Sequence, residues 1–240
     1  MRESPKRIAL ILPTLNEIDG MKAVLPKIDR SLFHEVIVVD GRSTDGTQEY
    51  CKGQGLIVLT QPNKGLPDAE ECAVKNSKSD AFIVFTPDGN SLPELLPEMC
   101  RLIREDWDIV VASRYYKGAK SEDDDVVTGF GNWLFTKAID ILFLSRLTDV
   151  LVGYRAYRRD AIEKMGFLDA PGETGSRRGY IYSWEPAASC RSARLRLKVL
   201  EIPGDEPKRI GGVRKLRVIS CGMGAVIQIL HDWLFFRRPG

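Results

Sequence analysis

Three short polar segments of this sequence each follow a run of apolar residues and carry side chains suited to binding charged ligands. In the segment Thr86–Asn90, Asp88 and Asn90 present a carboxylate and an amide, whose oxygens are the ligands that hard divalent cations prefer. A cation held in this way keeps coordination positions open for a diphosphate. Asp-Gly sequences are also common in ordinary turns, so the spacing alone is compatible with either a metal site or a simple turn.

The other two polar segments, Pro13–Glu17 and Asp40–Thr47, are rich in hydroxyl, amide and carboxylate groups. Asp40 directly follows an apolar run, where its carboxylate can accept a hydrogen bond from a nucleoside base or ribose. Asp45 has either a similar role or that of a cap on the following helix. Pro13–Glu17 is compatible with nucleoside binding and equally with a strand-to-helix turn capped by Asn16.

Apolar runs of strand length predict the elements that position these segments. They are Ile8–Leu12, Val36–Val39, Leu56–Leu59, Ala81–Phe85 and Ile109–Ala112, with stretches able to form helices between them. This alternation predicts an α/β fold with a mainly parallel sheet covered by helices on both faces. Open sheets of this kind bind ligands at the carboxyl ends of their strands, where the three polar segments are predicted to lie.

The second half of the sequence contains two long apolar stretches. Asn132–Leu147 is apolar on nearly every side, which predicts a helix that is either buried or lies at a membrane surface. A basic, glycine-rich stretch, Lys208–Arg217, precedes a C-terminal apolar helical segment. No run reaches the ~20 apolar residues that a membrane span needs. We predict a main domain over residues 1–217 and a helical appendage over residues 218–240.

Composition places the chain among ordinary globular proteins and excludes few functions. Of its 240 residues, 43% are hydrophobic and 28% are charged, and the net charge of +2 gives no reason to expect a nucleic-acid partner. The 5 cysteines are scattered, which fits a reducing, cytoplasmic environment better than a disulfide framework or zinc site. Arg191, Arg194 and Arg196 predict either a solvated helix face or a patch for anionic lipid head groups.

Taken in order, the short motifs PTLNE, VVDGRSTDGT, NKG, TPDGN and ASRY resemble those of family-2 glycosyltransferases with the GT-A fold. The later strings DVLVGYRAYRR, YSWE and LEIPGDEPKRIGGVRKLR resemble the subgroup of dolichyl- and polyprenyl-phosphate mannose and glucose synthases. The resemblance covers about residues 7–217 and implies inverting sugar transfer from a UDP- or GDP-sugar. The acceptor that it implies is a polyprenyl or dolichyl phosphate, with a saccharide hydroxyl as the alternative.

The resemblance also implies roles for individual residues of the nucleotide site. Asp88 is the first ligand of a Mg²⁺ or Mn²⁺ ion, and Asn90 stands where the family usually has a second aspartate. An amide oxygen still binds such a cation but brings no charge. The residues implied to line or close the nucleoside pocket are Pro13, Thr14, Glu17, Asp40, Lys64 and Gly65.

Cationic residues are implied to meet the phosphate groups of donor and acceptor. Arg114, in the ASRY motif, matches an arginine that contacts a phosphate, for which a planar guanidinium is well shaped. Arg209, Arg214 and Lys215 fall in a loop that folds over the diphosphate in the subgroup. From its glycines and cations we expect this loop to become ordered when nucleotide binds.

The need for a general base depends on the acceptor. A phosphate acceptor is already anionic and needs none, whereas a hydroxyl acceptor requires a carboxylate such as Glu185 or one in the loop Asp123–Asp125. The aromatic neighbours Tyr182 and Trp184 favour Glu185 as that base. The alternative is a structural glutamate that anchors the arginine-rich loop.

The sequence departs from the family pattern at further positions. Thr128–Gly131 replaces an arginine that many relatives carry just before Asn132, and Leu92 lies where related synthases have a glutamine that contacts the metal. These departures weigh against a lipid phosphate but not against glycosyl transfer. Because Asn90 replaces a charged metal ligand, a non-catalytic module that only binds nucleotide is an alternative function. A sugar nucleotidyltransferase is a second alternative, but the sequence PTLNE after the first predicted strand argues against it. Peripheral contact with the cytoplasmic face of a membrane and homo-oligomerisation are both compatible with the sequence.

Overall fold

A computed structural model describes residues 3–169, 181–211 and 218–237 of the chain. Within these residues, one seven-stranded sheet has the order β3-β2-β1-β4-β6-β5-β7, and only β6 runs antiparallel to its neighbours. The strands are β1 (Ile8–Thr14), β2 (Glu35–Asp40), β3 (Ile57–Thr60), β4 (Ala81–Val84), β5 (Ile109–Ser113), β6 (Arg155–Arg158) and β7 (Val199–Pro203). The prediction of a mainly parallel α/β sheet is confirmed, and every predicted strand is present.

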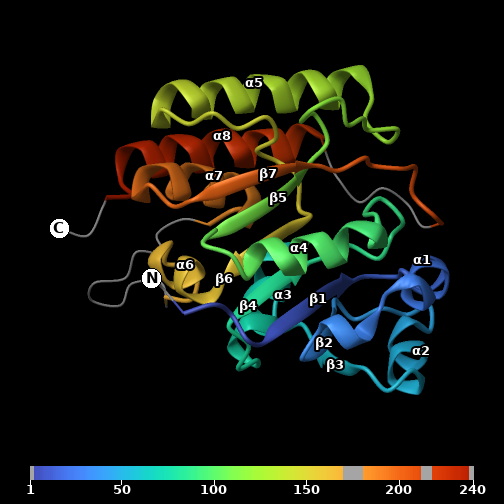
Figure 1. Ribbon diagram of the computed structural model, residues 1–240. Coiled ribbons are helices and arrows are strands. Elements are labelled where there is room, and N and C mark those ends of the chain that lie inside the picture. The colour runs from blue at the N-terminus through green and yellow to red at the C-terminus, as the bar shows by residue number, and fades with distance from the viewer. Residues whose placement is uncertain (1–2, 170–180, 212–217, 238–240) are drawn as a thin grey trace.

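Helices cover both faces of this sheet (Figure 1). The helices are α1 (Ile18–Val24), α2 (Thr47–Gly53), α3 (Leu66–Lys75), α4 (Leu96–Ile103), α5 (Val126–Phe143), α6 (Arg159–Lys164), α7 (Trp184–Leu195) and α8 (Val218–Leu234). Short 3₁₀ turns occur at η1 (Leu25–Lys27), η2 (Arg30–Leu32) and η3 (Pro93–Leu95). Because β1 and β4 are covered on both sides, their side chains are buried almost without alternation, as parallel strands require.

Helix α5 begins and ends earlier than the sequence predicts. Its start is fixed by a capping box in which the Asp125 side chain accepts from the backbone N–H of Thr128, while the Thr128 hydroxyl accepts from that of Asp125. At the other end Leu144 adopts a left-handed conformation with φ of 57°. The Asp140 carboxylate then accepts from Leu147 N at 3.0 Å, which turns the chain away from the helix.

Helices α5, α7 and α8 pack against one another at the β7 side of the sheet (Figure 1). The predicted solvated arginine face of α7 is wrong for Arg191, whose side chain is fully buried. Arg191 donates to both oxygens of the equally buried Asp232 on α8, at 3.0 Å each, and to the carbonyl of Met165 at 2.8 Å. A buried guanidinium needs such partners. The division of the chain at residue 218 stays a prediction.

Candidate active site at the carboxyl edge of the sheet

The turn after β4 presents Asp88 and Asn90 with defined orientations. Both residues are more than nine-tenths buried, and Asp88 Oδ1 accepts from the backbone N–H of Asn90 at 3.1 Å. The amide nitrogen of Asn90 donates to the carbonyl of Pro207 at 2.9 Å, so its Oδ1 points elsewhere. That oxygen is buried and has no hydrogen-bond partner among the described residues. An unpartnered amide oxygen beside a carboxylate fits a hard cation.

The segment after β7 covers this turn closely. Gly89 has φ of 91°, and a Cβ atom there would lie 2.6 Å from Cγ1 of Ile210, so the contact requires glycine. Arg209 donates to Asp88 Oδ2 at 2.7 Å and to Glu17 Oε1 at 3.3 Å. The structure thus brings Glu17, Asp88, Asn90 and Arg209 together, while the role of each residue stays a prediction. Arg214 and Lys215 lie outside the described residues.

Asp40 is fully buried, and its carboxylate is saturated by internal donors. It accepts from the hydroxyl of Thr14 at 2.9 Å, the N–H and hydroxyl of Ser43 at 2.8 and 2.6 Å, and the amide of Gln48 at 2.7 Å. These donors fill the positions at which a carboxylate ordinarily accepts hydrogen bonds. Asp40 therefore ties the ends of β1 and β2 to α2, and its contact with a nucleoside stays a prediction.

The neighbouring polar residues fix the loops around this position. Asp45 accepts from Ile18 N and Thr47 N, both at 3.0 Å, and so joins the first turns of α1 and α2. The predicted capping of α1 by Asn16 is wrong, because Glu17 is the N-cap residue and Asn16 Oδ1 accepts from Thr44 N at 2.8 Å. A hollow of about 180 Å³ beside these loops is lined by Asn16, Glu17, Ile18, Asp19, Gly20, Asp45 and Ile210.

Two of the remaining nucleoside-pocket residues lie at the start of α3. Lys64 is exposed, and Gly65 is the N-cap residue with φ of 108°. The carbonyl of Gly65 accepts from the Gln61 amide at 2.5 Å, which fixes the turn. The next residue, Leu66, lines the main cavity, so this segment borders the site, whereas closure over a nucleotide stays a prediction. Pro13 is partly buried within β1.

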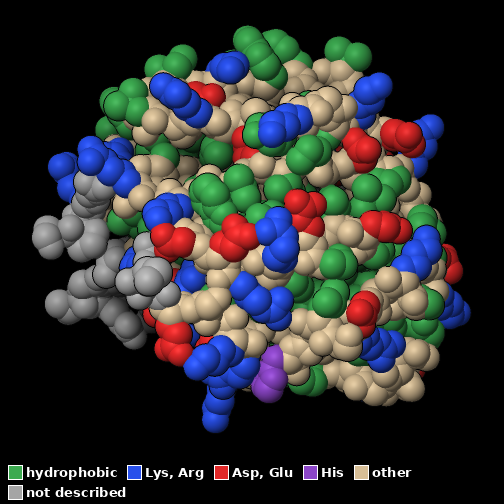
Figure 2. Space-filling model, viewed as in Figure 1, with side chains coloured by type: hydrophobic (Ala, Val, Ile, Leu, Met, Phe, Trp, Pro, Cys, Tyr) green, Lys and Arg blue, Asp and Glu red, His purple; other side chains and the backbone are tan. Residues whose placement is uncertain are grey.

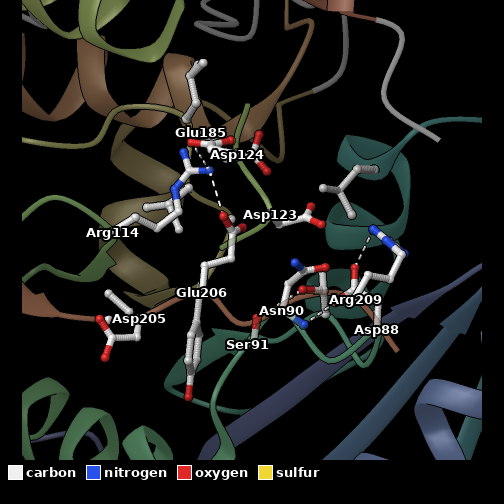
Figure 3. A pocket seen from close by; sticks show the side chains of 18 residues that line it. Asp88, Asn90, Ser91, Arg114, Asp123, Asp124, Glu185, Asp205, Glu206 and Arg209 are labelled. Atoms are coloured by element: carbon white, nitrogen blue, oxygen red, sulfur yellow. Dashed lines mark hydrogen bonds and ion pairs between the residues drawn. The ribbon is translucent and has the colours of Figure 1, made fainter. Parts of the chain in front are cut away.

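The main cavity, of about 290 Å³, extends from Asp88 toward the second half of the chain. Figure 3 shows Asp88, Asn90 and Arg209 on one side, with Arg114 and several carboxylates on the other. The acidic residues that line the cavity are Asp88, Asp123, Asp124, Glu185, Asp205 and Glu206. The basic residues that line the cavity are Arg114 and Arg209. The described lining is therefore strongly negative, which suits cations and sugar hydroxyls.

Arg114 is surrounded by three carboxylates from separate segments. It donates to Asp149 at 2.7 and 3.1 Å, to Glu206 at 3.3 Å and, more weakly, to Asp124 at 3.5 Å. Burial lowers the pKa of Arg114, but these carboxylates outweigh burial and raise it. For the predicted contact with a phosphate, Arg114 would have to exchange its hydrogen bond to Glu206 or Asp124 for one to the phosphate. Asp149 and Glu206 are not among the site residues predicted from the sequence, although both lie within its later motifs.

Glu185 lies in the first turn of α7 and lines the cavity with 6% exposure. The Ser183 hydroxyl donates to its carboxylate. Burial and the negative charge of Glu185 raise the pKa of Glu70, a fully buried residue of α3, well above its usual range. Glu185 thus lies in the cavity, while its role as a base stays a prediction, and Glu70 is a second buried carboxyl group that the sequence did not reveal.

Residues 9–166 match the protein family described as glycosyl transferase family 2. The chain belongs to this family. It is 29% identical over 244 residues to an undecaprenyl-phosphate mannosyltransferase of Micrococcus luteus, a match that covers 98% of this chain and 97% of that protein. It is 30% identical to a dolichyl-phosphate hexose transferase of Haloferax volcanii, over 69% of this chain and 72% of that protein. These findings confirm a family-2 glycosyltransferase of the hexosyltransferase type.

Solved structures confirm the GT-A fold. Glucosyl-3-phosphoglycerate synthase of Mycobacterium tuberculosis, crystallised with Mn²⁺, UDP and its product, aligns with a TM-score of 0.67. The alignment covers 98% of this chain and 81% of that protein, at 18% sequence identity. At that identity the likeness concerns the fold, and the substrates of the mycobacterial enzyme are its own.

Proposed function

We propose that this glycosyltransferase moves a hexose from a UDP- or GDP-sugar to a polyprenyl phosphate, with inversion and with a divalent cation. The observation that carries the proposal is the buried pair Asp88 and Asn90 at the edge of the cavity, with Asn90 Oδ1 unpartnered among the described residues. The acceptor is supported by the names of the Micrococcus and Haloferax relatives.

Asp88 and Asn90 are the residues that would hold Mg²⁺ or Mn²⁺. Among the described residues no group of three His, Cys, Asp or Glu side chains is arranged to hold a metal, so the protein contributes few ligands. This fits Mg²⁺, which usually binds through one or two carboxylates together with substrate phosphates and water. When bound, the cation would supply positive charge to the leaving diphosphate.

The chain's own residues orient the reactants. The segment Pro207–Gly211 covers Asp88 from one side, and Arg209 is close enough to donate to a diphosphate bound there. Arg114 holds Asp124 and Glu206 at the opposite wall, where carboxylates suit the hydroxyl groups of a hexose, and Arg114 is itself anchored by the buried Asp149. A phosphate acceptor enters as an anion and requires no proton transfer from Glu185.

The lipid acceptor would be reached through the exposed apolar side chains of α5 and α8. Those of α5 are Val126, Val127, Phe130, Trp133, Leu134 and Ile141, and those of α8 are Ile219, Met223, Val226, Ile227, Leu230, Trp233 and Leu234. Figure 2 shows apolar side chains with Lys and Arg among them over this end of the molecule. None of the helices in the described segments has the length and apolarity to cross a bilayer. We therefore propose peripheral contact with the membrane.

Vesicle binding tests this contact. Trp133→Asp or Ile227→Asp should weaken sedimentation with vesicles that contain anionic phospholipid by about tenfold, because each places a charge in the apolar interface. The matched control is Ile57→Asp, an exposed residue of β3 at the opposite edge of the sheet. Equal binding of all variants would argue against contact through α5 and α8.

A transfer assay tests the activity. The enzyme is incubated with labelled UDP- or GDP-hexose, Mg²⁺ or Mn²⁺ and polyprenyl phosphate in vesicles. Label is expected in the organic phase in a product that mild acid cleaves. Label only in a water-soluble saccharide would contradict the lipid acceptor and favour a hydroxyl acceptor with Glu185 as base, which the position of Glu185 in the cavity supports. Nucleotide binding without any transfer would indicate a non-catalytic module.

A further inference from the structure

Arg209 makes one ion pair with Asp88 of the proposed cation site and another with Glu17 beside it. Its guanidinium donates to Asp88 Oδ2 at 2.7 Å and to Glu17 Oε1 at 3.3 Å, as Figure 3 shows for Asp88. Asp88 comes from the turn after β4, and Glu17 precedes α1. A single positive charge thus lies between two carboxylates from distant parts of the chain, which reduces their mutual repulsion.

The backbone on both sides of Arg209 is hydrogen-bonded to the Asp88–Asn90 turn. Ile210 N donates to the carbonyl of Asp88 at 2.7 Å, and the Asn90 amide donates to the carbonyl of Pro207 at 2.9 Å. Gly89 permits this approach because any Cβ atom would collide with Ile210. The ion pairs are therefore anchored on both sides of Arg209 by backbone contacts. The position of the guanidinium is built into the local structure.

Two buried polar atoms at this contact have no hydrogen-bond partner within the described parts of the chain. One is Asn90 Oδ1, an acceptor, and the other is Arg209 Nε, a donor. Buried groups of this kind are costly unless a ligand completes them. The acceptor matches a cation and the donor matches an anion. A cation bound to a diphosphate would satisfy both.

Arg209 and a divalent cation compete for the same oxygen atom, Asp88 Oδ2. A guanidinium nitrogen already lies 2.7 Å from this oxygen, and Mg²⁺ would need the oxygen at about 2.0–2.1 Å within a near-octahedral shell. A cation must also overcome repulsion from the positive charge of Arg209. Without nucleotide, the cation and Arg209 therefore compete for Asp88.

We propose that Arg209 acts as an internal counter-ion that makes cation binding conditional on the nucleotide diphosphate. Before nucleotide binds, Arg209 neutralises Asp88 and Glu17 and keeps the affinity for free cation low. When the diphosphate arrives, Arg209 transfers its hydrogen bonds from Asp88 to phosphate oxygens, and Asp88 Oδ2 becomes available to the cation. The inference rests on the proposed cation site and adds to it an order of binding and the residue that sets this order.

The test is a Mn²⁺ titration of the full chain, with free Mn²⁺ followed by electron paramagnetic resonance. Wild type, Arg209→Gln and the control Arg101→Gln are compared, since Arg101 is an exposed residue of α4 that pairs only on the surface. Arg209→Gln should bind Mn²⁺ alone about tenfold more tightly than wild type, the size expected when one charge-assisted contact stops competing. Arg101→Gln should match wild type. Thermal unfolding checks that each variant is folded.

The tighter binding distinguishes competition from a simple role in diphosphate binding. A residue that only contacts the diphosphate would leave the affinity for Mn²⁺ alone unchanged, and that result would overturn the inference. With UDP or GDP present, the variant should show a smaller gain in Mn²⁺ affinity than wild type does. Asp88→Asn combined with Arg209→Gln should abolish the tighter binding, because it removes the carboxylate for which the two cations compete.

Failure of the proposed cation site would have a different signature. If neither wild type nor Arg209→Gln binds Mn²⁺, with or without UDP or GDP, the assignment of Asp88 as a metal ligand is wrong and the inference fails with it. If wild type binds Mn²⁺ only with nucleotide while Arg209→Gln shows no gain without nucleotide, the cation site stands and the competition by Arg209 is refuted.

Discussion

The two halves of the molecule are held together in different ways. Around β1, β2 and β4, the polar groups are fixed mainly by hydrogen bonds from loops at the ends of neighbouring strands, as at Asp40 and Asp45. Around β5, β7 and the last helices, charged groups meet across long stretches of sequence, as at Arg114 with Glu206 and Arg191 with Asp232. The hydrogen bonds of the first half therefore follow from short sequence motifs, whereas the ion pairs of the second half follow from tertiary packing.

The largest expected effect is a loss of turnover when Asp88, in the first half, is replaced. Asp88→Ala should lower turnover about 10⁴-fold, because it removes the one carboxylate that the Asp88–Asn90 pair offers to a cation. The fold should persist, since Arg209 keeps its ion pair with Glu17 when the Asp88 carboxylate is removed. Rates with saturating donor and a thermal unfolding curve measure the two effects. Full activity of the variant, or of wild type in excess EDTA, would contradict the cation site.

Breaking the long-range pair of the second half should instead cost stability. Arg191→Met leaves Asp232 charged and buried, so the free energy of unfolding should fall by about 3–5 kcal/mol. Urea denaturation measures the loss. The matched variant Arg191→Met with Asp232→Leu removes both charges and should recover much of it. If the double variant is as unstable as the single one, packing rather than the uncompensated charge explains the effect.

A third prediction concerns Glu70 of α3, a fully buried carboxyl group whose pKa responds to the charges of Glu185 and Arg155. Its folded pKa is raised by burial, so above the ordinary value of 4.5 the native state retains a proton that the unfolded chain releases. The free energy of unfolding therefore falls as pH rises from there through the folded pKa. Glu70→Gln should be more stable than wild type at pH 8, with little difference at pH 4.

Denaturation at both pH values measures this difference for Glu70→Gln and for an exposed control, Glu98→Gln. The control should show the same pH dependence as wild type. A Glu70→Gln variant that is less stable than wild type at pH 8 would mean that the charged carboxylate of Glu70 is favourably paired with Arg155.

The smallest effect is expected at the capping box of α5. Asp125→Ala removes the side chain that accepts from Val127 N and Thr128 N and should lower the free energy of unfolding by about 1 kcal/mol. Glu122→Ala, an exposed residue of the same loop, is the control. Urea denaturation measures both. Equal stability of the two variants would indicate that packing on α7 and α8 alone fixes where α5 begins.

Much of the first half was predictable from the sequence for physical reasons. Parallel strands buried on both faces must be apolar throughout, which makes runs such as Ile8–Leu12 and Ala81–Phe85 visible without any structure. Polar residues directly after such runs must reach the carboxyl edge of the sheet, which located Asp88 and Asn90. The start of α5 at Val126 was also encoded locally, by Asp125 and Thr128, although the predicted helix began at Asn132.

What the sequence by itself determined is therefore strands β1 to β5 of the sheet, the segments at its carboxyl edge and membership of the glycosyltransferase family, whereas β6 and β7 were not among the predicted strands. Tertiary structure alone decided the partners of the charged residues. In the sequence Arg191 cannot be distinguished from a surface arginine, and only the folded chain pairs it with the buried Asp232. In the same way, Arg209 is one cation of a loop in the sequence, and only the fold brings it to Asp88. The reason is that hydrophobic periodicity and turn residues are local properties, whereas the environment of a charge depends on groups that only the folded chain brings together.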